Sequence, residues 1–279
     1  QTFDWYIYSS SGSLLGSAVG LGFEDAYVDG IDNIKFYTGA DSITYWDAFG
    51  YSWDPNYTVG DNMECRNSHF PATYSFENDA SGSIPDGWID NSGEGCSATV
   101  ISGFGGHNDV LDLHDQGGYP YQSIIKVGFS AQTSGTVEFW WNLGDDKSRE
   151  PYVRLETGGT PVVWLNTWNK WTYRDGSGWV YLDLNNNNQW YHHRIDFECG
   201  AGGYMGLPAH RFDWYVDGIQ IVNDAEFYYD ADSVDNFYLS TNPTYCLIHS
   251  YIDAVGFSWD PSYNIGDNIK SESWVGGKV

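Results

Sequence analysis

The sequence predicts an all-β protein, and two features of its pattern carry that prediction. Short alternating or apolar runs rich in Tyr, Trp, Val and Ile are separated by clusters of Gly, Asn, Asp and Pro, as in strands joined by turns. Helical periodicity is nearly absent along the whole chain. Because no helices separate the expected strands, parallel α/β folds are excluded and an antiparallel sandwich is favoured.

The expected strands follow one another with short turns between them. They are Thr136–Asn142, Tyr152–Glu156, Pro161–Leu165, Trp179–Leu184, Trp190–Glu198, Phe212–Val216, Val234–Ser240 and Ser250–Phe257. The run Asn185–Asn188 is expected to form a turn, and Asp217-Gly218 is typical of a tight hairpin. The segment Trp164–Tyr173 is too polar for a buried strand, so its rings are expected to face a groove.

An internal repeat is the strongest signal in the chain. Residues 45–62 read YWDAFGYSWDPNYTVGDN, and residues 251–268 read YIDAVGFSWDPSYNIGDN. The tetrapeptide FDWY occurs at residues 3–6 and again at 212–215. Ordered matches at such steady spacing indicate a repeating unit of roughly 200 residues.

The repeat predicts the domain organisation. Residues 65–268 form one complete unit, residues 1–64 correspond to the last third of another, and residues 269–279 are a tail or linker. An isolated partial sandwich would leave unpaired strand edges. Three explanations stay open: the chain is part of a longer polypeptide, another copy supplies the missing strands, or residues 1–64 form a small self-sufficient sheet.

Composition and charge exclude several classes of partner. The chain has 12 Lys and Arg residues against 38 Asp and Glu residues, a formal net charge of −26. Nucleic acids and polybasic membrane contacts both require basic surfaces, so neither is expected. No apolar run approaches the roughly 18 residues that a membrane-spanning helix needs. The sequence starts with Gln and shows no leader, so a mature or excised product is expected.

Four scattered cysteines suggest disulfides rather than a metal site. Cys65, Cys96, Cys199 and Cys246 include no C-x-x-C pair, so zinc is not indicated. An even count in an aromatic-rich chain with few lysines favours an oxidising, extracellular location. Three pairings are open, of which Cys65–Cys96 with Cys199–Cys246 is favoured because each pair lies within one segment. Four free buried thiols are the alternative.

Four segments in a fixed order carry a resemblance to a known superfamily. They are GTVEFWW at 135–141, QWYHHRIDF at 189–197, FDWYVDG at 212–218 and YIDAVG at 251–256. Their order resembles the laminin-G and concanavalin A-like lectin–glucanase superfamily, which implies a jelly-roll β-sandwich. The SWDP…GDN ending is similar to tandem repeats of large archaeal cell-surface proteins.

The resemblance does not extend to catalytic motifs. Glucanases of this fold place carboxylates on one strand face through an E-x-D-x-E pattern, and this chain has no such spacing. Asp196 and Glu198 come closest but lack a third partner. Lyases of this fold use Gln-x-His, whereas this chain has adjacent His192 and His193, which a strand would point to opposite faces. Catalysis is therefore not expected.

The resemblance does imply structural calcium. In similar sandwiches a calcium ion joins the first and last strands, and the matching positions here are Glu77 and Asp253, with Asp47 the equivalent in the partial unit. A carboxylate buried at Asp253 would need a cation or strong hydrogen bonds. The loop at 260–268, matched by 54–62, is a second candidate, although Asp-Pro and Gly-Asp-Asn also form turns without metal.

Aromatic residues also suggest carbohydrate binding. Sugars stack on exposed rings and hydrogen-bond to the polar groups around them. The candidates are Trp164, Trp168, Trp171 and Tyr173. The alternative is that the same rings fill a core or a protein interface.

Three functional hypotheses follow. The first is an extracellular repeat protein of a cell-surface layer, fibre or adhesin, which assembles with copies of itself and is stabilised by calcium. The second is a carbohydrate-binding module of a polysaccharide-active or adhesive protein. The third is a glycoside hydrolase or polysaccharide lyase of the same fold.

Overall fold

The computed structural model describes residues 2–8, 14–22, 69–144, 150–244 and 247–269. The chain divides into two compact units, residues 1–66 and residues 67–279. In the first unit, strands β1 (Thr2–Tyr8) and β2 (Leu14–Gly22) pair antiparallel as a hairpin. Among the described residues, no helix has the length and apolar character needed to span a bilayer.

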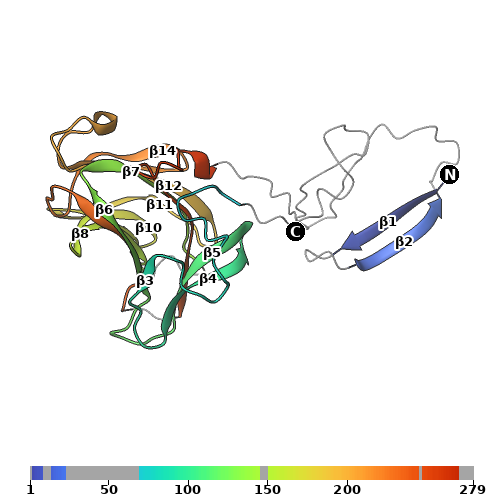
Figure 1. The fold of residues 1–279 in the computed structure, drawn as a ribbon. Helices are drawn as coiled ribbons and strands as arrows, with labels where there is room; N and C mark the ends of the chain where they lie inside the picture. Colours follow the sequence, from blue (N-terminus) through green and yellow to red (C-terminus); the bar gives the residue numbers. More distant parts are fainter. Residues whose placement is uncertain (1, 9–13, 23–68, 145–149, 245–246, 270–279) are drawn as a thin grey trace. The chain divides into compact units, whose positions relative to one another are not determined.

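The second unit is a sandwich of two antiparallel sheets with seven strands each (Figure 1). The first sheet has the order β11 (Gly178–Leu184), β10 (Lys170–Asp175), β9 (Thr160–Thr167), β8 (Tyr152–Thr157), β15 (Val234–Ser240), β6 (Ile124–Gln132) and β3 (Trp88–Asp90). The second has the order β14 (Ile219–Glu226), β13 (Arg211–Val216), β12 (Trp190–Glu198), β7 (Ser134–Asn142), β16 (Ile248–Phe257), β5 (His107–Asp115) and β4 (Cys96–Phe104). Two short 3-10 turns complete it, η2 (Tyr204–Gly206) and η3 (Asp267–Ile269). The predicted all-β jelly-roll class is confirmed.

The core lies between the two sheets. Alternation along each strand sends one row of side chains inward and the next row outward. On β7, Phe139 and Trp141 are buried in the core, whereas Glu138, just before Phe139, points to the outward side. Ring pairs join the sheets, with Phe139 5.4 Å from Phe237 and Trp141 5.6 Å from Trp171.

Strand prediction succeeded where one face alternates cleanly. All eight expected strands are present, with ends shifted by a few residues at most. The expectation that Trp164–Tyr173 is no buried strand was wrong, because β9 and β10 form a hairpin through this segment. Its polar residues lie on the outward side, and Trp171 occupies the core side at 3% exposure.

One pair of repeated segments has the same local structure in both units. The FDWY at 3–6 lies in β1 and the FDWY at 212–215 lies in β13, and each of these strands opens an antiparallel hairpin. The second hairpin turns at Asp217-Gly218, both with positive φ, as the dipeptide predicted. The repeat at 45–62 lies outside the described residues, and so does most of the predicted 1–64 partial unit.

Candidate functional site

The outward surface of the first sheet carries a concentration of aromatic rings, which we call the aromatic face. Strand register arranges them in rows that cross the sheet. Tyr238 pairs with Arg154, which pairs with Trp164 on its other side. Trp164 in turn pairs with Arg174, and Arg174 pairs with Trp179. The aromatic face comprises Tyr152, Trp164, Trp168, Trp179, Tyr181, Tyr228 and Tyr238, with Arg154 and Arg174 among them.

The two arginine side chains lie against these rings. The guanidinium carbon of Arg154 is 3.8 Å from the ring centre of Trp164 and 4.4 Å from that of Tyr152. The guanidinium carbon of Arg174 is 4.5 Å from the ring centre of Tyr228 and 5.3 Å from that of Trp164. Because cations are attracted to the electron-rich faces of aromatic rings, these contacts hold rings and arginines in one arrangement.

A hollow of about 100 Å³ opens on the aromatic face. Trp168, Trp179 and Tyr181 line it and are 47%, 38% and 49% exposed. Its lining also contains Asn166, which is 6% exposed and whose Oδ1 has no hydrogen-bond partner among the described residues. Glu150 contributes a carboxyl group, and burial raises its pKa. Exposed rings beside a few fixed polar groups are the composition that suits a sugar ring.

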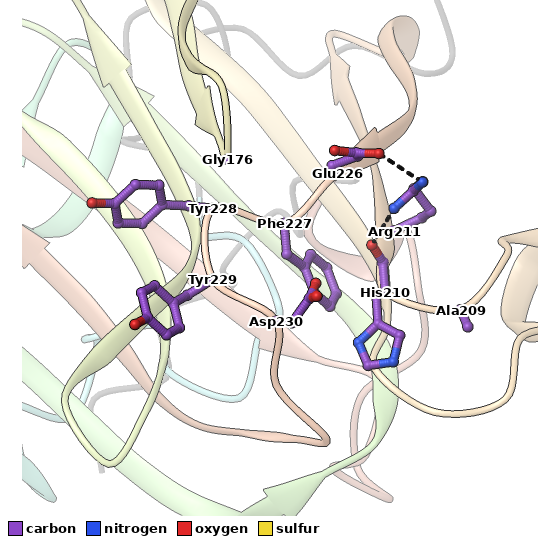
Figure 2. Close-up of a pocket in the computed structure, with 9 residues that line it drawn as sticks. All are labelled: Gly176, Ala209, His210, Arg211, Glu226, Phe227, Tyr228, Tyr229 and Asp230. Atoms are coloured by element: carbon purple, nitrogen blue, oxygen red, sulfur yellow. Dashed lines mark hydrogen bonds and ion pairs between the residues drawn. The ribbon is translucent and has the colours of Figure 1, made fainter.

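A larger hollow of about 600 Å³ lies beside Tyr228. Figure 2 shows Tyr228 and Tyr229 on one side of it and Arg211 on the other. Arg211 is already paired with Glu226 at 2.9 Å. The Tyr228 ring lies 5.4 Å from that of Trp164, so this hollow adjoins the aromatic face.

The structure divides the four predicted sugar-binding residues between two sides of the sheet. Trp164 and Trp168 lie on the aromatic face. Trp171 is buried 4.7 Å from the ring of His193, and Tyr173 packs partly buried against the core. Both are corrected to core residues, because alternate residues of β10 point to opposite sides.

Two residues of the aromatic face were missed by the sequence analysis. Trp179 and Tyr181 lie two residues apart on β11 and point outward together. The alternation of GWVYLDL, with an aromatic residue at two successive outward positions, was a signal that could have found them.

The outward side of the second sheet is covered by residues 258–269, which we call the closing segment. The Tyr263 hydroxyl donates to Glu138 Oε2 at 2.6 Å, and the Gly266 amide donates to the same oxygen at 2.6 Å. The Tyr263 ring lies directly on Gly256, where a Cβ atom would come within 2.1 Å of it. The glycine of YIDAVG and the tyrosine of SWDPSY therefore fit together as one packing unit.

Asn268 fixes the end of the closing segment. Its backbone oxygen accepts from Trp140 Nε1 at 2.7 Å, and its Nδ2 donates to the Ala254 carbonyl at 2.8 Å. Its Oδ1 lies 2.9 Å from His192 Nε2. In the second unit, Tyr263, Gly256 and Asn268 of the repeated motif therefore hold the closing segment against the sheet.

The aspartates of the closing segment take part in turns. Asp260 Oδ1 accepts from the Ser262 amide at 2.9 Å, and Asp267 Oδ2 accepts from the Asn264 amide at 2.9 Å. Such hydrogen bonds are what Asp-Pro and Gly-Asp-Asn turns make without a metal ion, which was the alternative to calcium binding for this loop.

The residues nearest to a catalytic pattern are engaged in structural contacts. Asp196 is fully buried and accepts from Arg194 Nε and Nη2 at 2.9 and 2.8 Å. Glu198 accepts from the backbone amides that open the following loop. His192 points outward beneath the closing segment, whereas His193 is buried in the core, as strand alternation predicted.

The predicted calcium residues lie in a cluster of carboxyl groups. Asp253 is buried, and its pKa is raised well above the usual value by burial and then by the charges of Glu77 and Asp109. Asp253 Oδ2 lies 2.7 Å from His107 Nδ1, and Asn108 Nδ2 donates to Glu77 Oε2. Glu77 Oε1 is buried and lies 3.2 Å from His69 Nδ1, so this oxygen already faces an imidazole.

Oxygen donors of this kind suit a hard divalent cation, although Glu77, Asp109 and Asp253 are not among the groups whose ligand atoms lie within 4.8 Å of one another in the described part of the chain. Carboxylate and amide oxygens are the ligands that calcium takes, and a cation would offset the mutual repulsion of the three carboxylates. Asp47, the predicted equivalent in the partial unit, lies outside the described residues.

A second group of metal-ligating side chains occupies β5 and β16. His249 Nδ1 lies 2.9 Å from Asp112 Oδ1, and the rings of His249 and His114 stack at 3.9 Å. Imidazole lone pairs lie in the ring plane, and these planes are only 17° from parallel. The ligand atoms of Asp112, His114 and His249 lie within 4.8 Å of one another, but the two stacked rings do not aim their lone pairs at one another.

The cysteine predictions depend on residues that are not described. Cys96 and Cys199 are not bonded to each other, and their predicted partners Cys65 and Cys246 lie outside the described residues. Burial raises the pKa of the Cys199 thiol to about 12, helped by Glu198. The predicted pairings stay predictions.

Comparison with known proteins identifies similar folds. No family model and no curated protein matches the chain. The carbohydrate-binding module CBM66 from Bacillus subtilis is 14% identical, over 61% of this chain and 94% of that one, with a TM-score of 0.38. The galectin LEC-6 from Caenorhabditis elegans is 11% identical, over 52% and 95%, with a TM-score of 0.33. The apo Crh5 transglycosylase is 13% identical, over 63% and 79%, with a TM-score of 0.42.

Proposed function

We propose that the second unit is a carbohydrate-binding module and that the aromatic face of its first sheet is the binding site. The observation that carries the proposal is the row of rings and arginines from Tyr238 to Trp179, bordered by exposed Trp168 and Tyr181. Rings already fixed by cation contacts lose little conformational freedom on binding, which favours affinity.

The size of the site suits an extended ligand. One hollow includes Thr172 and the other includes Gly176. Gly176 directly follows the end of β10 at Asp175, and at about 3.3 Å per residue Thr172 and Asp175 are about 10 Å apart along the strand. A polymer lying along β10 would therefore contact both hollows, with Trp164 between them.

The proposal is tested by binding measurements on the full chain. Affinity electrophoresis against a panel of soluble polysaccharides selects a ligand, and calorimetry then compares the chain with a Trp168→Ala/Trp179→Ala variant. We expect at least a tenfold loss of affinity with an unchanged Tm, because both rings are exposed. Tyr119→Ala removes a ring that is 80% exposed outside the aromatic face and serves as the matched control.

Two results would contradict this proposal. Binding that survives the double variant, or that Tyr119→Ala weakens to the same extent, would place the site elsewhere. Failure to bind any polysaccharide of the panel would contradict the function itself.

We further propose that calcium occupies the carboxyl cluster and has a structural role. Glu77, Asp109 and Asp253 would hold it through carboxylate oxygens, with Asn108 beside them. The ion would supply the positive charge that this cluster lacks, and would tie the segment before β3 to β16. The role is separate from glycan binding.

The cell-surface assembly hypothesis rests on residues 1–64 and stays a prediction. Light scattering followed by electron microscopy tests it: filaments or sheets would support completion of residues 1–64 by another copy. A 31.4 kDa monomer would leave glycan binding as the sole role. Secretion is part of both hypotheses, and catalysis is part of neither.

A further inference from the structure

Positive side chains are scarce in this chain, yet three of them lie on the aromatic face. The chain has 12 Lys and Arg residues against 38 Asp and Glu residues. Lys126, Arg154 and Arg174 lie in one row across the first sheet, with Lys126 opposite Tyr238. A protein with a formal charge of −26 therefore presents cations between the rings proposed to contact sugar.

Arg174 differs from the arginines of the second sheet. Arg194 and Arg211 are ion-paired, to Asp196 at 2.8 Å and to Glu226 at 2.9 Å. Within the part of the chain that the structure describes, no carboxylate lies within 4.0 Å of Arg174, and its buried Nε has no hydrogen-bond partner. Among the described residues, its guanidinium group contacts the rings of Trp164, Trp179 and Tyr228.

Arg154 is only partly satisfied. Its Nη1 lies 3.5 Å from Glu156 Oε1, at the limit of a hydrogen bond, and its buried Nε has no partner. Buried donors without acceptors are unfavourable, so an acceptor supplied by a ligand would be stabilising. Guanidinium groups match the planar oxygens of carboxylates and sulfates through paired hydrogen bonds.

The carboxylate that follows Arg174 in sequence and the one that lines the smaller hollow are already engaged. Asp175 Oδ1 accepts from the amides of Ser177 and Gly178 at 2.7 and 3.0 Å. Glu150 Oε2 accepts from Asn242 Nδ2 at 2.7 Å. Both are held by other groups, which leaves the guanidinium of Arg174 open to an external anion.

We propose that the aromatic face recognises an anionic glycan, one carrying uronic carboxylates or sulfate groups, and that Arg174 binds its anionic group. The inference rests on the proposed function and narrows its ligand. The rings bind the sugar faces, and Arg174 supplies the preference for charge.

The experiment uses two pairs of polymers that differ only in charge. De-esterified galacturonan against its methyl ester tests the carboxylate, and dextran sulfate against dextran tests the sulfate. We expect the full chain to bind at least one anionic member at least tenfold more tightly than its neutral partner, and more weakly in high salt. Which pair shows the difference identifies the anion.

Variants then locate the preference. Arg174→Gln should lose at least tenfold in affinity for the anionic polymer, whereas Arg174→Lys should keep part of it. Gln220→Glu, on the exposed side of β14, changes the net charge equally and should bind as the unmodified chain does. Tm measurements on each variant confirm folding.

The outcomes separate the two proposals. Equal binding of neutral and charged polymers, abolished by Trp168→Ala/Trp179→Ala, would overturn the anion preference and keep the glycan-binding function. A charge preference that survives in Arg174→Gln, or falls equally in Gln220→Glu, would also overturn it. No binding to either pair or to the wider panel would overturn both.

Discussion

Arg154 and Trp164 face each other across the β8–β9 ladder, with the guanidinium carbon 3.8 Å from the ring centre. Arg154 also contacts the rings of Tyr152 and Tyr238, at 4.4 and 5.1 Å. One cation therefore joins three rings from β8, β9 and β15. The aromatic face depends on this side chain for its shape as well as its charge.

The ion pair between Arg154 and Glu156 leads to a first prediction. Glu156 is 3% exposed, and burial raises its pKa while Arg154 lowers it. Arg154→Met leaves this carboxylate buried without its cation and should lower the free energy of unfolding by about 3 kcal/mol. Glu156→Gln alone should have a smaller effect, and the double variant should recover part of the loss. Urea denaturation of all four proteins measures the coupling, and strictly additive effects would contradict it.

A second prediction separates two tryptophans of the same hairpin region. Trp171 is 3% exposed among Trp141, Tyr191 and Trp214, so Trp171→Ala should lower the free energy of unfolding by about 3–5 kcal/mol. Trp179 is 38% exposed, and Trp179→Ala should change the free energy of unfolding by less than about 1 kcal/mol. Denaturation curves test both, and similar losses in the two variants would contradict the assignment of their sides.

The closing segment supports a third prediction. Tyr263→Phe removes the 2.6 Å hydrogen bond to Glu138 but keeps the ring on Gly256. Because the carboxylate stays buried with one donor fewer, the free energy of unfolding should fall by about 1.5–3 kcal/mol. Tyr229→Phe, at a ring that is 60% exposed, should have no measurable effect. Equal stability of the two variants would mean that the hydroxyl does not hold the segment.

The sequence was sufficient for the fold class because strand alternation is a local property. Thr136–Asn142 shows it plainly, with Phe139 and Trp141 inward and Glu138 outward. The same alternation places Trp171 and Tyr173 toward the core, although the average polarity of their segment argues against a buried strand. Thr172 and Arg174 supplied that polarity from the opposite side of the strand.

The aromatic face itself could not be predicted from local pattern. Arg154 and Tyr238 meet only because β8 pairs with β15, at a separation of 84 residues along the chain. A shift of one residue in that register would send Arg154 into the core. Glu77 and Asp253 were proposed through a resemblance, and nothing in the local sequence pointed to Asp109 beside them.

Calcium removal provides a fourth prediction. If an ion neutralises Glu77, Asp109 and Asp253, the Tm should fall in EDTA and recover with calcium, since an ion that binds only the folded state stabilises it. Asp253→Asn removes one buried charge while its side-chain oxygen can still accept from the Ala254 amide. This variant should show little response to calcium and should be at least as stable as the unmodified chain in EDTA. An identical Tm for the unmodified chain with and without calcium would contradict the site.

The buried imidazoles give a fifth prediction, on acid stability. Burial lowers the pKa of His107 to about 3, and it lowers the pKa of His192 and His193 below the ordinary value of 6.5. These side chains are neutral in the folded state and take up protons on unfolding, so the folded state loses stability as the pH falls below 6.5. Each contributes a slope approaching about 1.4 kcal/mol per pH unit. Urea denaturation between neutral pH and pH 5 should show this dependence. His192→Gln should make the dependence of stability on pH less steep, whereas a stability independent of pH over this range would contradict the lowered pKa values of these imidazoles.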